Sequence, residues 1–382
     1  MRILYLDLDA LTPSHLSCYG YGRNTSPHMD ELGAGAVRLT NVYCSDAPCL
    51  PSRSALYSGR FGIQSGVVGH GGRAAQPKIQ PLAHRGFRDL FDSQGLAGRL
   101  QQAGLHTAMV SPFGQRHAAH WFYAGFNEVH NTGRGGQEIV PDVDPHVHRW
   151  LDANALTDNW FLHVNYWDIH TPYRTPGDYG NPFEGEAIDD WYTDDVIARH
   201  AAQGGPHTAR DLDMYKSWDT SIFPRIPEEV VDRASLVKWI DGYDTAIRYV
   251  DDAVGRIVDK LKQLGIYDET AIIISADHGE NHGELGLYGE HATADHATCN
   301  IPMIIKWPGG ASGEVRGGLQ YHLDLAPTLM ELMGRDPSPI WDGQSYASDL
   351  LGGERGGRDD LVVSQCAHVC QRSVRWNDGD RR

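Results

Sequence analysis

The feature that most constrains the fold of this chain is a series of short apolar segments separated by longer stretches of helical pattern. Five of these segments have the length and composition of β-strands: Ile3 to Leu8, Thr107 to Val110, Trp160 to Asn165, Ala271 to Ser275 and Pro302 to Lys306. Alternation of strands with helices favours a mostly parallel sheet with helices on both faces. The sequence therefore predicts an α/β fold.

Two long stretches lie between the third and fourth predicted strands. From Leu236 to Leu261 apolar residues recur at helical spacing, and Gly265 follows as a stop signal, which predicts one long helix or two in series. Residues 171 to 230 are instead rich in Pro, Gly, Trp, Tyr and Asp and show little periodicity. Such a stretch is typical of a lid over an active-site mouth, although a disordered insertion would have the same composition.

Charge and composition exclude several classes of protein. The 382 residues include 50 acidic and 33 basic side chains, for a formal net charge of −17, which disfavours nucleic-acid binding. No apolar run approaches the roughly 18 residues of a membrane span, and Met1 leads directly into a strand pattern without a signal peptide. We expect a protein without nucleic-acid or membrane partners and with a cytoplasmic location.

The cysteines do not form a recognisable disulfide or zinc pattern. They stand at positions 18, 44, 49, 299, 366 and 370, without dense even spacing or a Cys-x-x-Cys pair. Most are therefore expected to be free thiols. The chain also lacks a P-loop, a Rossmann glycine motif and a Gly-x-Ser-x-Gly elbow at a strand-to-helix junction, which disfavours nucleotide-dependent and serine-hydrolase chemistry.

Two predicted strands end in residues that can bind a metal ion. In an open α/β sheet, ligands bind beyond the carboxyl ends of the strands. The first strand runs into Asp7 and Asp9, which share one face because strand side chains alternate, and the fourth is followed by Asp277 and His278. A hard divalent cation prefers several oxygen ligands. These residues could supply most of a metal shell, although acidic residues at strand ends are more often solvated turns.

A possible nucleophile lies between these two strand ends. Cys49 precedes a helix that is predicted to begin at Pro51 and Ser52. The start of a helix offers free backbone N–H groups and the positive end of the helix dipole. Cys49 would therefore lie in an anion site, and Arg53, one helical turn further on, could reach the same anion.

The segment from Cys49 to Arg53 matches the Cys-x-Pro-x-Arg element of the sulfatase family, in which the cysteine is oxidised to formylglycine. Further segments resemble the same family, in the same order and over nearly the whole chain: Leu8 to Gly20, Asn24 to Leu32, Val37 to Asn41, Asp168 to Tyr173, Tyr243 to Asp252, Asp277 to Glu280, Ile301 to Gly309 and Asp324 to Leu329. The chain therefore resembles a sulfatase, a branch of the alkaline-phosphatase superfamily.

This resemblance implies a fold and a domain division. The fold is a large mixed, mostly parallel sheet sandwiched by helices, alkaline-phosphatase-like, with a smaller C-terminal subdomain that is short or incomplete here. We expect residues 1–335 to form the catalytic domain, with 171–230 as a lid-like excursion. Residues 336–382 would be the remnant of the C-terminal subdomain.

The resemblance also implies a metal site. The family often has two adjacent acidic residues where this sequence has Asp9 and Ala10. Asp7 could replace the missing ligand, or it could be a buried acid without contact to the cation. The implied ligands are Asp9, Asp277, His278, the modified Cys49 and the alternative Asp7. The cation is expected to be Ca²⁺, with Mn²⁺ as the alternative because imidazole ligation favours transition metals.

The catalytic residues implied by the resemblance are Cys49, Arg53, His117, His170 and His291. Cys49, as formylglycine, would attack sulfur, with Arg53 and His291 stabilising the transferred group. His170, in the loop that matches the family most closely, would protonate the leaving alcohol. His117 would be the general base or, like Arg116, an anion-binding residue, unless a displaced loop leaves both merely exposed. His70 and Arg116 complete the list as substrate-binding residues.

The implied activity is metal-dependent hydrolysis of a small-molecule or carbohydrate sulfate ester, after a formylglycine-generating maturase has acted on Cys49. Two alternatives remain open at this level. Related formylglycine enzymes hydrolyse phosphonate monoesters or phosphodiesters. The family usually has a Gly-Lys-Trp-His stretch where this sequence has Val110 to His120, and the absent lysine and the short C-terminus are also compatible with a catalytically silent protein.

Overall fold

A nine-stranded mixed sheet lies at the centre of the computed structural model, which describes residues 1–78, 80–81, 87–88, 91, 93–213, 218–354, 356–365 and 371–376. The strands follow one another in space as β11 (Glu314–Arg316), β2 (Val37–Tyr43), β10 (Asn300–Lys306), β9 (Thr270–Ser275), β1 (Arg2–Leu8), β8 (Trp160–Tyr166), β6 (His106–Val110) and β7 (Glu128–His130). The short β12 (Gln320–Tyr321) pairs with β2.

The strands β9, β1, β8, β6 and β7 run parallel to one another, whereas β10 is antiparallel to both β9 and β2. All five predicted strands form, each longer by one or two residues than the apolar run that predicted it. Every residue of β1, β8 and β9 is buried. This explains why their sequences are continuous apolar runs, as expected for parallel strands covered on both faces. The predicted fold class is confirmed.

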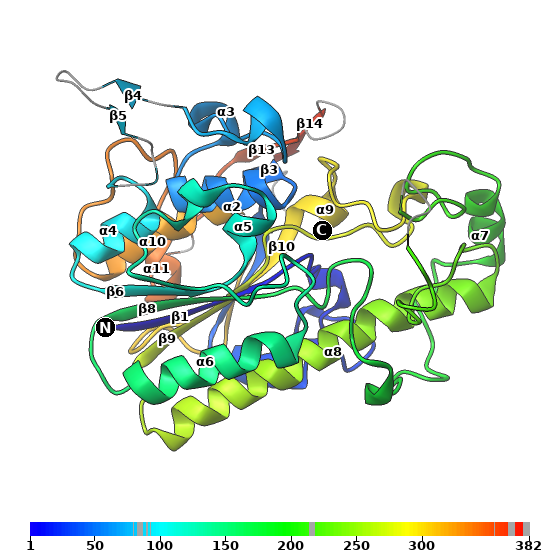
Figure 1. The fold of residues 1–382 in the computed structure, drawn as a ribbon, viewed down its shortest axis with the longest axis horizontal. Helices are drawn as coiled ribbons and strands as arrows, with labels where there is room; N and C mark the ends of the chain where they lie inside the picture. The colour runs from blue at the N-terminus through cyan, green and yellow to red at the C-terminus, as the bar shows by residue number, and fades with distance from the viewer. Residues whose placement is uncertain are drawn as a thin grey trace.

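Helices cover both faces of the sheet (Figure 1). One face is covered by α6 (Val140–Asn154) and by α8 (Arg233–Gln263), which packs against α1 (Pro27–Ala34) and forms as one 31-residue helix. The Asp232 carboxylate caps α8 by accepting from the Ser235 backbone N–H at 2.8 Å. The other face is covered by α2 (Cys49–Ser58), α4 (Leu96–Gln102), α5 (Phe113–Arg116), α10 (Leu325–Leu332) and α11 (Ala347–Leu350).

A second sheet joins the C-terminal part of the chain to the segment before Cys49. The strand β13 (Asp360–Gln365) is antiparallel to β14 (Gln371–Trp376) and parallel to β3 (Asp46–Ala47). Leu361 and Val363 are buried in a small cluster with Ala47 and other apolar residues. The remaining short elements are α3 (Gly62–Ser65), α9 (His296–Cys299) and the pair β4 (Gln80–Pro81) and β5 (Phe87–Arg88).

The excursion of residues 171–230 contains one α-helix within its described part, α7 (Asp194–Ala201), and lies beside the N-terminal half of α8 (Figure 1). Several of its side chains, among them Tyr192, Leu212 and Ile226, are buried in the main core. The described residues of this segment are therefore packed onto the domain. Their role as a lid stays a prediction, as does the domain division.

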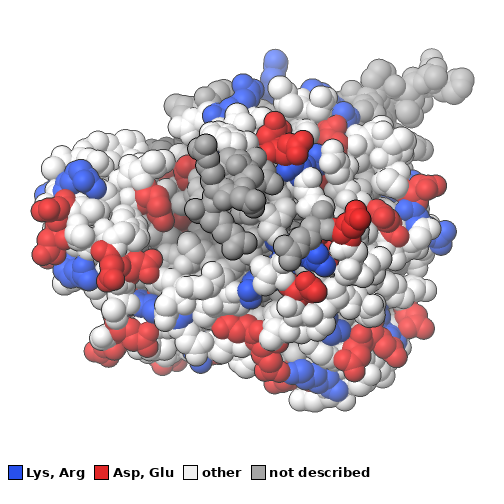
Figure 2. Space-filling model, turned by 180° about the vertical axis from the view of Figure 1, so that it is seen from behind, with Lys and Arg blue, Asp and Glu red and all other residues white. Residues whose placement is uncertain are grey.

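Figure 2 shows acidic and basic side chains mixed over the face opposite to that of Figure 1. None of the helices in the described ranges is long and apolar enough to cross a membrane. Cys18, Cys44, Cys49 and Cys299 are free thiols, as predicted. Cys366 and Cys370 lie outside the described residues.

The packing of Trp341 against the C-terminal end of α2 can be tested. Gly59 ends the helix with φ = 65°, and a Cβ atom there would lie 2.4 Å from Cγ of Trp341. Gly59→Ala should therefore lower the free energy of unfolding by more than the roughly 1–2 kcal/mol cost of a left-handed residue. Gly20→Ala is the matched control, because Gly20 has φ = 102° with open space around it. Equal losses in urea titrations would contradict the packing of Trp341 on α2.

Candidate active site

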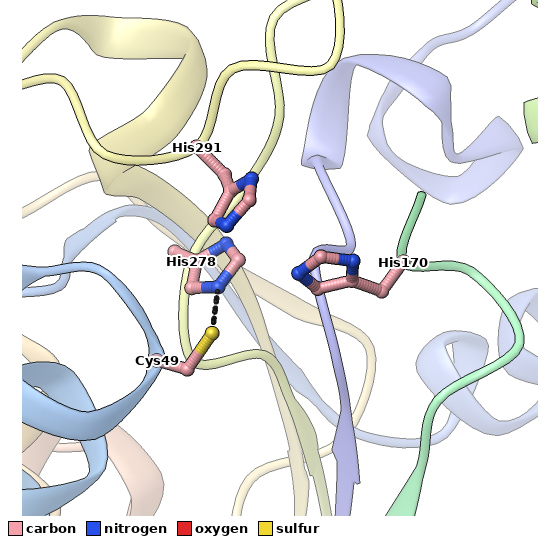
Figure 3. A group of neighbouring side chains, drawn as sticks. All are labelled: Cys49, His170, His278 and His291. Carbon is pink, nitrogen blue, oxygen red and sulfur yellow. Dashed lines mark hydrogen bonds between the residues drawn. The ribbon is translucent and has the colours of Figure 1, made fainter. Parts of the chain in front are cut away.

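Three parallel strands and one helix bring the predicted site residues together. The register places Asp7 of β1 opposite Asn165 of β8 and Ser275 of β9, so these strands end at one edge of the sheet. The segments that leave this edge carry the histidines, and α2 faces them with its first residue. Cys49, His170, His278 and His291 point toward one another (Figure 3).

Cys49 is the first residue of α2, so the predicted start of this helix at Pro51 is wrong by two residues. Its side chain is buried, with Sγ 3.0 Å from Nε2 of His278. One of the backbone N–H groups at the start of α2 already has an acceptor, because the Leu50 N–H donates to Nε2 of His70 at 3.3 Å. The predicted substrate residue His70 therefore lies at the N-terminus of α2.

The three histidines around Cys49 share one orientation. The Nδ1 atom of each lies within hydrogen-bond distance of a backbone carbonyl oxygen: Thr171 for His170 (2.7 Å), Gly279 for His278 (2.8 Å) and Gly289 for His291 (3.2 Å). A carbonyl oxygen only accepts, so Nδ1 carries the proton in each neutral ring and Nε2 keeps a lone pair. Cys49 then donates its S–H to His278, and all three rings can serve as ligands or acceptors.

Burial keeps these groups neutral. It raises the pKa of the Cys49 thiol well above its usual value, with Asp9 and Asp277 adding to the effect. Burial likewise lowers the pKa of His291 to about 4 and that of His170 well below its ordinary range. Because a thiol reacts as its thiolate, Cys49 is a poor nucleophile in its unmodified form.

Arg53 binds carboxylates on three sides. Its Nε donates to Oδ2 of Asp7 at 2.6 Å and its Nη1 to Oδ2 of Asp277 at 2.6 Å, while Nη2 lies 3.0 Å from Oδ2 of Asp9. All four side chains are buried. The guanidinium therefore offsets part of the negative charge of these acids. The expected contact of Arg53 with a bound anion stays a prediction.

Asp7 is held by a chain of buried side chains. His163 Nε2 lies 3.1 Å from the same Oδ2 that Arg53 binds, and Tyr57 OH lies 2.7 Å from His163 Nδ1. Asp7 is absent from the groups of side chains in the described ranges that could share one metal ion. The geometry therefore favours the alternative in which Asp7 is a buried acid that orients Arg53.

A cation would fit between four of the predicted ligands. The ligand atoms of Asp9, Cys49, Asp277 and His278 all lie within 4.8 Å of one another. Within the described part of the chain, neither carboxylate oxygen of Asp9 has a hydrogen-bond partner, although both are buried. A buried carboxylate without hydrogen bonds is costly, so the residues present fit a divalent metal.

His170 and His291 complete a second group with Cys49 and His278, whose ligand atoms also lie within 4.8 Å of one another. The His170 and His291 rings are 4.5 Å apart, and the His278 and His291 rings stack at 5.0 Å. His170 Nε2 is 3.9 Å from Oδ1 of Asp9. These histidines therefore line the space next to the candidate metal site.

The region around His117 differs from the core of the site. Its ring is half-buried and lies 4.8 Å from that of His70. Burial, with His70 and Arg116 adding to it, lowers the pKa of His117 to about 2. Because general bases work best near the operating pH, this low pKa disfavours the general-base role. Arg116 is exposed and lies over the Trp167 ring.

Sequence reasoning missed two residues that support the site. Glu280 is buried and accepts from Thr171 Oγ1 (3.1 Å) and Tyr173 OH (2.8 Å), which ties the His170 loop to the metal segment. Arg174 donates to the carbonyl oxygen of His170 at 3.2 Å. Glu280 lies in the segment from Asp277 that resembles the family, but its hydrogen-bond partners are distant in sequence and only the fold reveals them.

Comparison with known proteins identifies the family. The Sulfatase family model matches residues 2–335. An arylsulfatase from Hemicentrotus pulcherrimus is 25% identical over 378 residues, which cover 92% of this chain and 62% of that protein. The chain thus spans less than two thirds of the length of this relative.

Two solved structures share the fold. A protein crystallised with its substrate D-glucosamine-2-N,6-O-disulfate superposes with a TM-score of 0.77 at 17% identity, covering 98% of this chain and 87% of the other. A phosphonate monoester hydrolase from Silicibacter pomeroyi gives 0.71 at 19% identity, covering 95% and 79%. At these identities the likeness concerns the fold alone.

The charge cluster of the site yields a stability test. Arg53→Gln would leave three buried carboxylates without their cation, which typically costs about 3–5 kcal/mol. Arg256→Gln is the control, since Arg256 pairs with Asp144 near the surface at 2.8 Å, where a pair is worth about 0–1 kcal/mol. Both free energies of unfolding are to be measured in urea without divalent cations. A loss of under 1 kcal/mol for Arg53→Gln would contradict this assignment.

Proposed function

The chain belongs to the sulfatase family, and on this basis we propose that it hydrolyses sulfate esters with a formylglycine derived from Cys49 and with one divalent cation. The observation that carries the proposal is the group formed by Cys49, Asp9, Asp277 and His278 at one edge of the sheet. A potential nucleophile and metal ligands from three separate segments meet there, in the arrangement that metal-assisted hydrolysis requires.

The state of the thiol supports modification of Cys49. Burial and the neighbouring acids hold its pKa far above its usual value, and its S–H faces His278 Nε2. A neutral thiol in an acidic pocket gains little nucleophilic reactivity from its position at the N-terminus of α2. Conversion to an aldehyde, which adds water to give two hydroxyl groups, would place oxygen where the sulfur lies.

The donor set supports a hard or borderline cation. Asp9 and Asp277 supply carboxylate oxygens, and His278 presents Nε2 because its Nδ1 donates to Gly279. We infer Ca²⁺, with Mn²⁺ as the alternative. When bound, the cation supplies positive charge to the nucleophilic oxygen and to the transferred group.

The other residues act on the substrate in this proposal. His291 faces the transferred group with Nε2, which donates to a sulfate oxygen once the bound anion has favoured protonation of the ring. His170 protonates the leaving oxygen. Its ring is neutral in the structure, and a bound sulfate would favour its protonation, because a nearby anion raises the pKa of a histidine. Arg53 holds Asp9 and Asp277 in place for the cation through its ion pairs with both carboxylates.

The substrate is proposed to be a small-molecule or carbohydrate sulfate ester, and the partner a formylglycine-generating maturase. The disulfated sugar bound to the structural neighbour described above supports the carbohydrate class. The likeness in fold to a phosphonate monoester hydrolase supports that activity as a second candidate. A turnover panel of aryl sulfates, sugar sulfates and phosphonate monoesters separates the two.

The modification can be tested by mass. After co-expression with a maturase, we expect the peptide that contains Cys49 to be about 18 Da lighter, because a thiol becomes an aldehyde. Cys49→Ala should abolish sulfate release and keep the fold, since loss of the nucleophile removes the reaction path. An unmodified thiol together with an inactive protein would favour the silent alternative, and full activity of Cys49→Ala would refute the mechanism.

The role of His170 can be tested by the leaving group. His170→Ala should slow sugar sulfates by roughly 100- to 10,000-fold, the usual contribution of a general acid. Nitrophenyl sulfate should lose much less, since its leaving group departs without a proton. If the histidine only fixes the start of the 171–230 segment, both esters would lose equally and the melting temperature would fall.

A further inference from the structure

Two guanidinium groups beside the candidate active site differ from Arg53, because in the described residues neither lies within ion-pair distance of a carboxylate. The first is Arg116, the last residue of α5. The only side-chain hydrogen bond of Arg116 within the described residues goes to the carbonyl oxygen of Gly135, at 3.3 Å. Its guanidinium carbon lies 5.2 Å from the centre of the Trp167 ring. Arg116 is exposed, so its charge is available to a ligand.

The second is Arg174, which lies, like His170, in the segment that follows β8. It donates to the carbonyl oxygens of Trp167 (3.1 Å) and His170 (3.2 Å) and to the side-chain oxygen of Gln137 (3.2 Å). All of these acceptors are neutral. Burial and, after it, the neighbouring charge of Arg116 lower the pKa of Arg174 to about 10, although the charges of Asp168, Asp9 and Glu138 act in the opposite direction. In the described residues, this half-buried cation therefore has no carboxylate as a hydrogen-bond partner.

One loop, residues 132–138, contacts the side chains of both arginines. The buried Glu138 folds it by accepting from Thr132 Oγ1, the Arg134 N–H and the Gly136 N–H at 2.7–2.8 Å. Gly136 has φ = 90°, and a Cβ atom there would lie 2.3 Å from Cδ of Arg116. The next residue, Gln137, holds Arg174. The two guanidinium groups are thus held by Gly135 and Gln137 of one loop with internal hydrogen bonds.

The position of the pair relates it to the leaving group. Arg174 bonds the backbone of His170, the residue proposed to protonate the departing oxygen. The Trp167 ring that lies under Arg116 is also 5.6 Å from the guanidinium carbon of Arg53, next to the candidate metal ligands. The pair therefore lies on the His170 side of the site, where the alcohol part of an ester would extend.

We propose that Arg116 and Arg174 form a subsite for a second anionic group, a carboxylate or a second sulfate, on the alcohol part of the substrate. The inference rests on the proposed sulfate ester hydrolysis and adds the substrate class, sulfate esters of acidic or multiply sulfated alcohols. Guanidinium groups bind planar and tetrahedral oxyanions through charge-assisted, often paired hydrogen bonds. Such an anion would neutralise both cations.

The test compares two esters that differ in one group. Methyl glucoside 2-sulfate and methyl glucuronoside 2-sulfate carry the same sulfated hydroxyl, but only the second has a carboxylate. We expect matured protein to favour the glucuronoside by about tenfold or more in kcat/KM, the effect of one or two charge-assisted hydrogen bonds. Arg116→Gln and Arg174→Gln should bring this ratio toward one. Arg134→Gln is the control in the same loop, because its side chain binds Asp142 at 2.9 Å, and it should keep the ratio.

Three outcomes would overturn the subsite: a ratio near one in the unsubstituted protein, a ratio that neither arginine variant changes, or equal losses for both esters in the variants. The last outcome would mean that the arginines bind the transferred sulfate or support the fold. Affinities of both esters for the Cys49→Ala protein, measured by calorimetry, should show the same preference. If the matured protein turns over neither these esters nor any aryl or sugar sulfate of the panel, the proposed function fails, and the affinity ratio still decides the subsite.

Discussion

The ion cluster around Arg53 is the interaction on which the rest of the site depends. Three carboxylates, from Asp7, Asp9 and Asp277, meet in an interior from which water is excluded, and each would repel the others without a cation between them. Arg53 supplies one positive charge against three negative ones. The remaining negative charge, together with the two Asp9 oxygens that lack hydrogen bonds in the described structure, is what makes the site suited to a divalent cation.

The fold explains why these groups can be so close. The parallel strands β1, β8 and β9 end at one edge of the sheet, and α2 begins there with Cys49. The segment before Cys49 is fixed by the pairing of β3 with β13, so the C-terminal part of the chain helps to place Cys49. Backbone carbonyls orient the surrounding histidines with Nε2 inward. Packing and hydrogen bonds outside the site therefore determine its geometry.

Much of this could be predicted from sequence. Buried strands are continuous apolar runs, and α8 has apolar residues at helical spacing, so the five main strands and this helix could be predicted. The Cys-Pro-Arg and Asp-His motifs indicated residues that the fold does bring together. Other features depend on contacts between distant segments and have no local signal. The bonds of Asp7 to Arg53 and His163, of Glu280 to the His170 loop, and of Arg174 to Gln137 are of this kind. The low pKa of His117 likewise follows from burial and not from any motif.

The central claim is that Asp9, Cys49, Asp277 and His278 hold one divalent cation. Its most direct test is a calorimetric titration of Ca²⁺ and Mn²⁺ into metal-stripped, matured protein and into the Asp9→Asn variant. Asp324→Asn serves as the control, because this buried acid lies outside the candidate metal groups and accepts from the N–H groups of Tyr321 and Gln344. We expect one ion per chain in the unsubstituted protein and in the control, and at least a tenfold weaker affinity in Asp9→Asn. Equal affinity in Asp9→Asn, or binding of Zn²⁺ alone, would contradict the account.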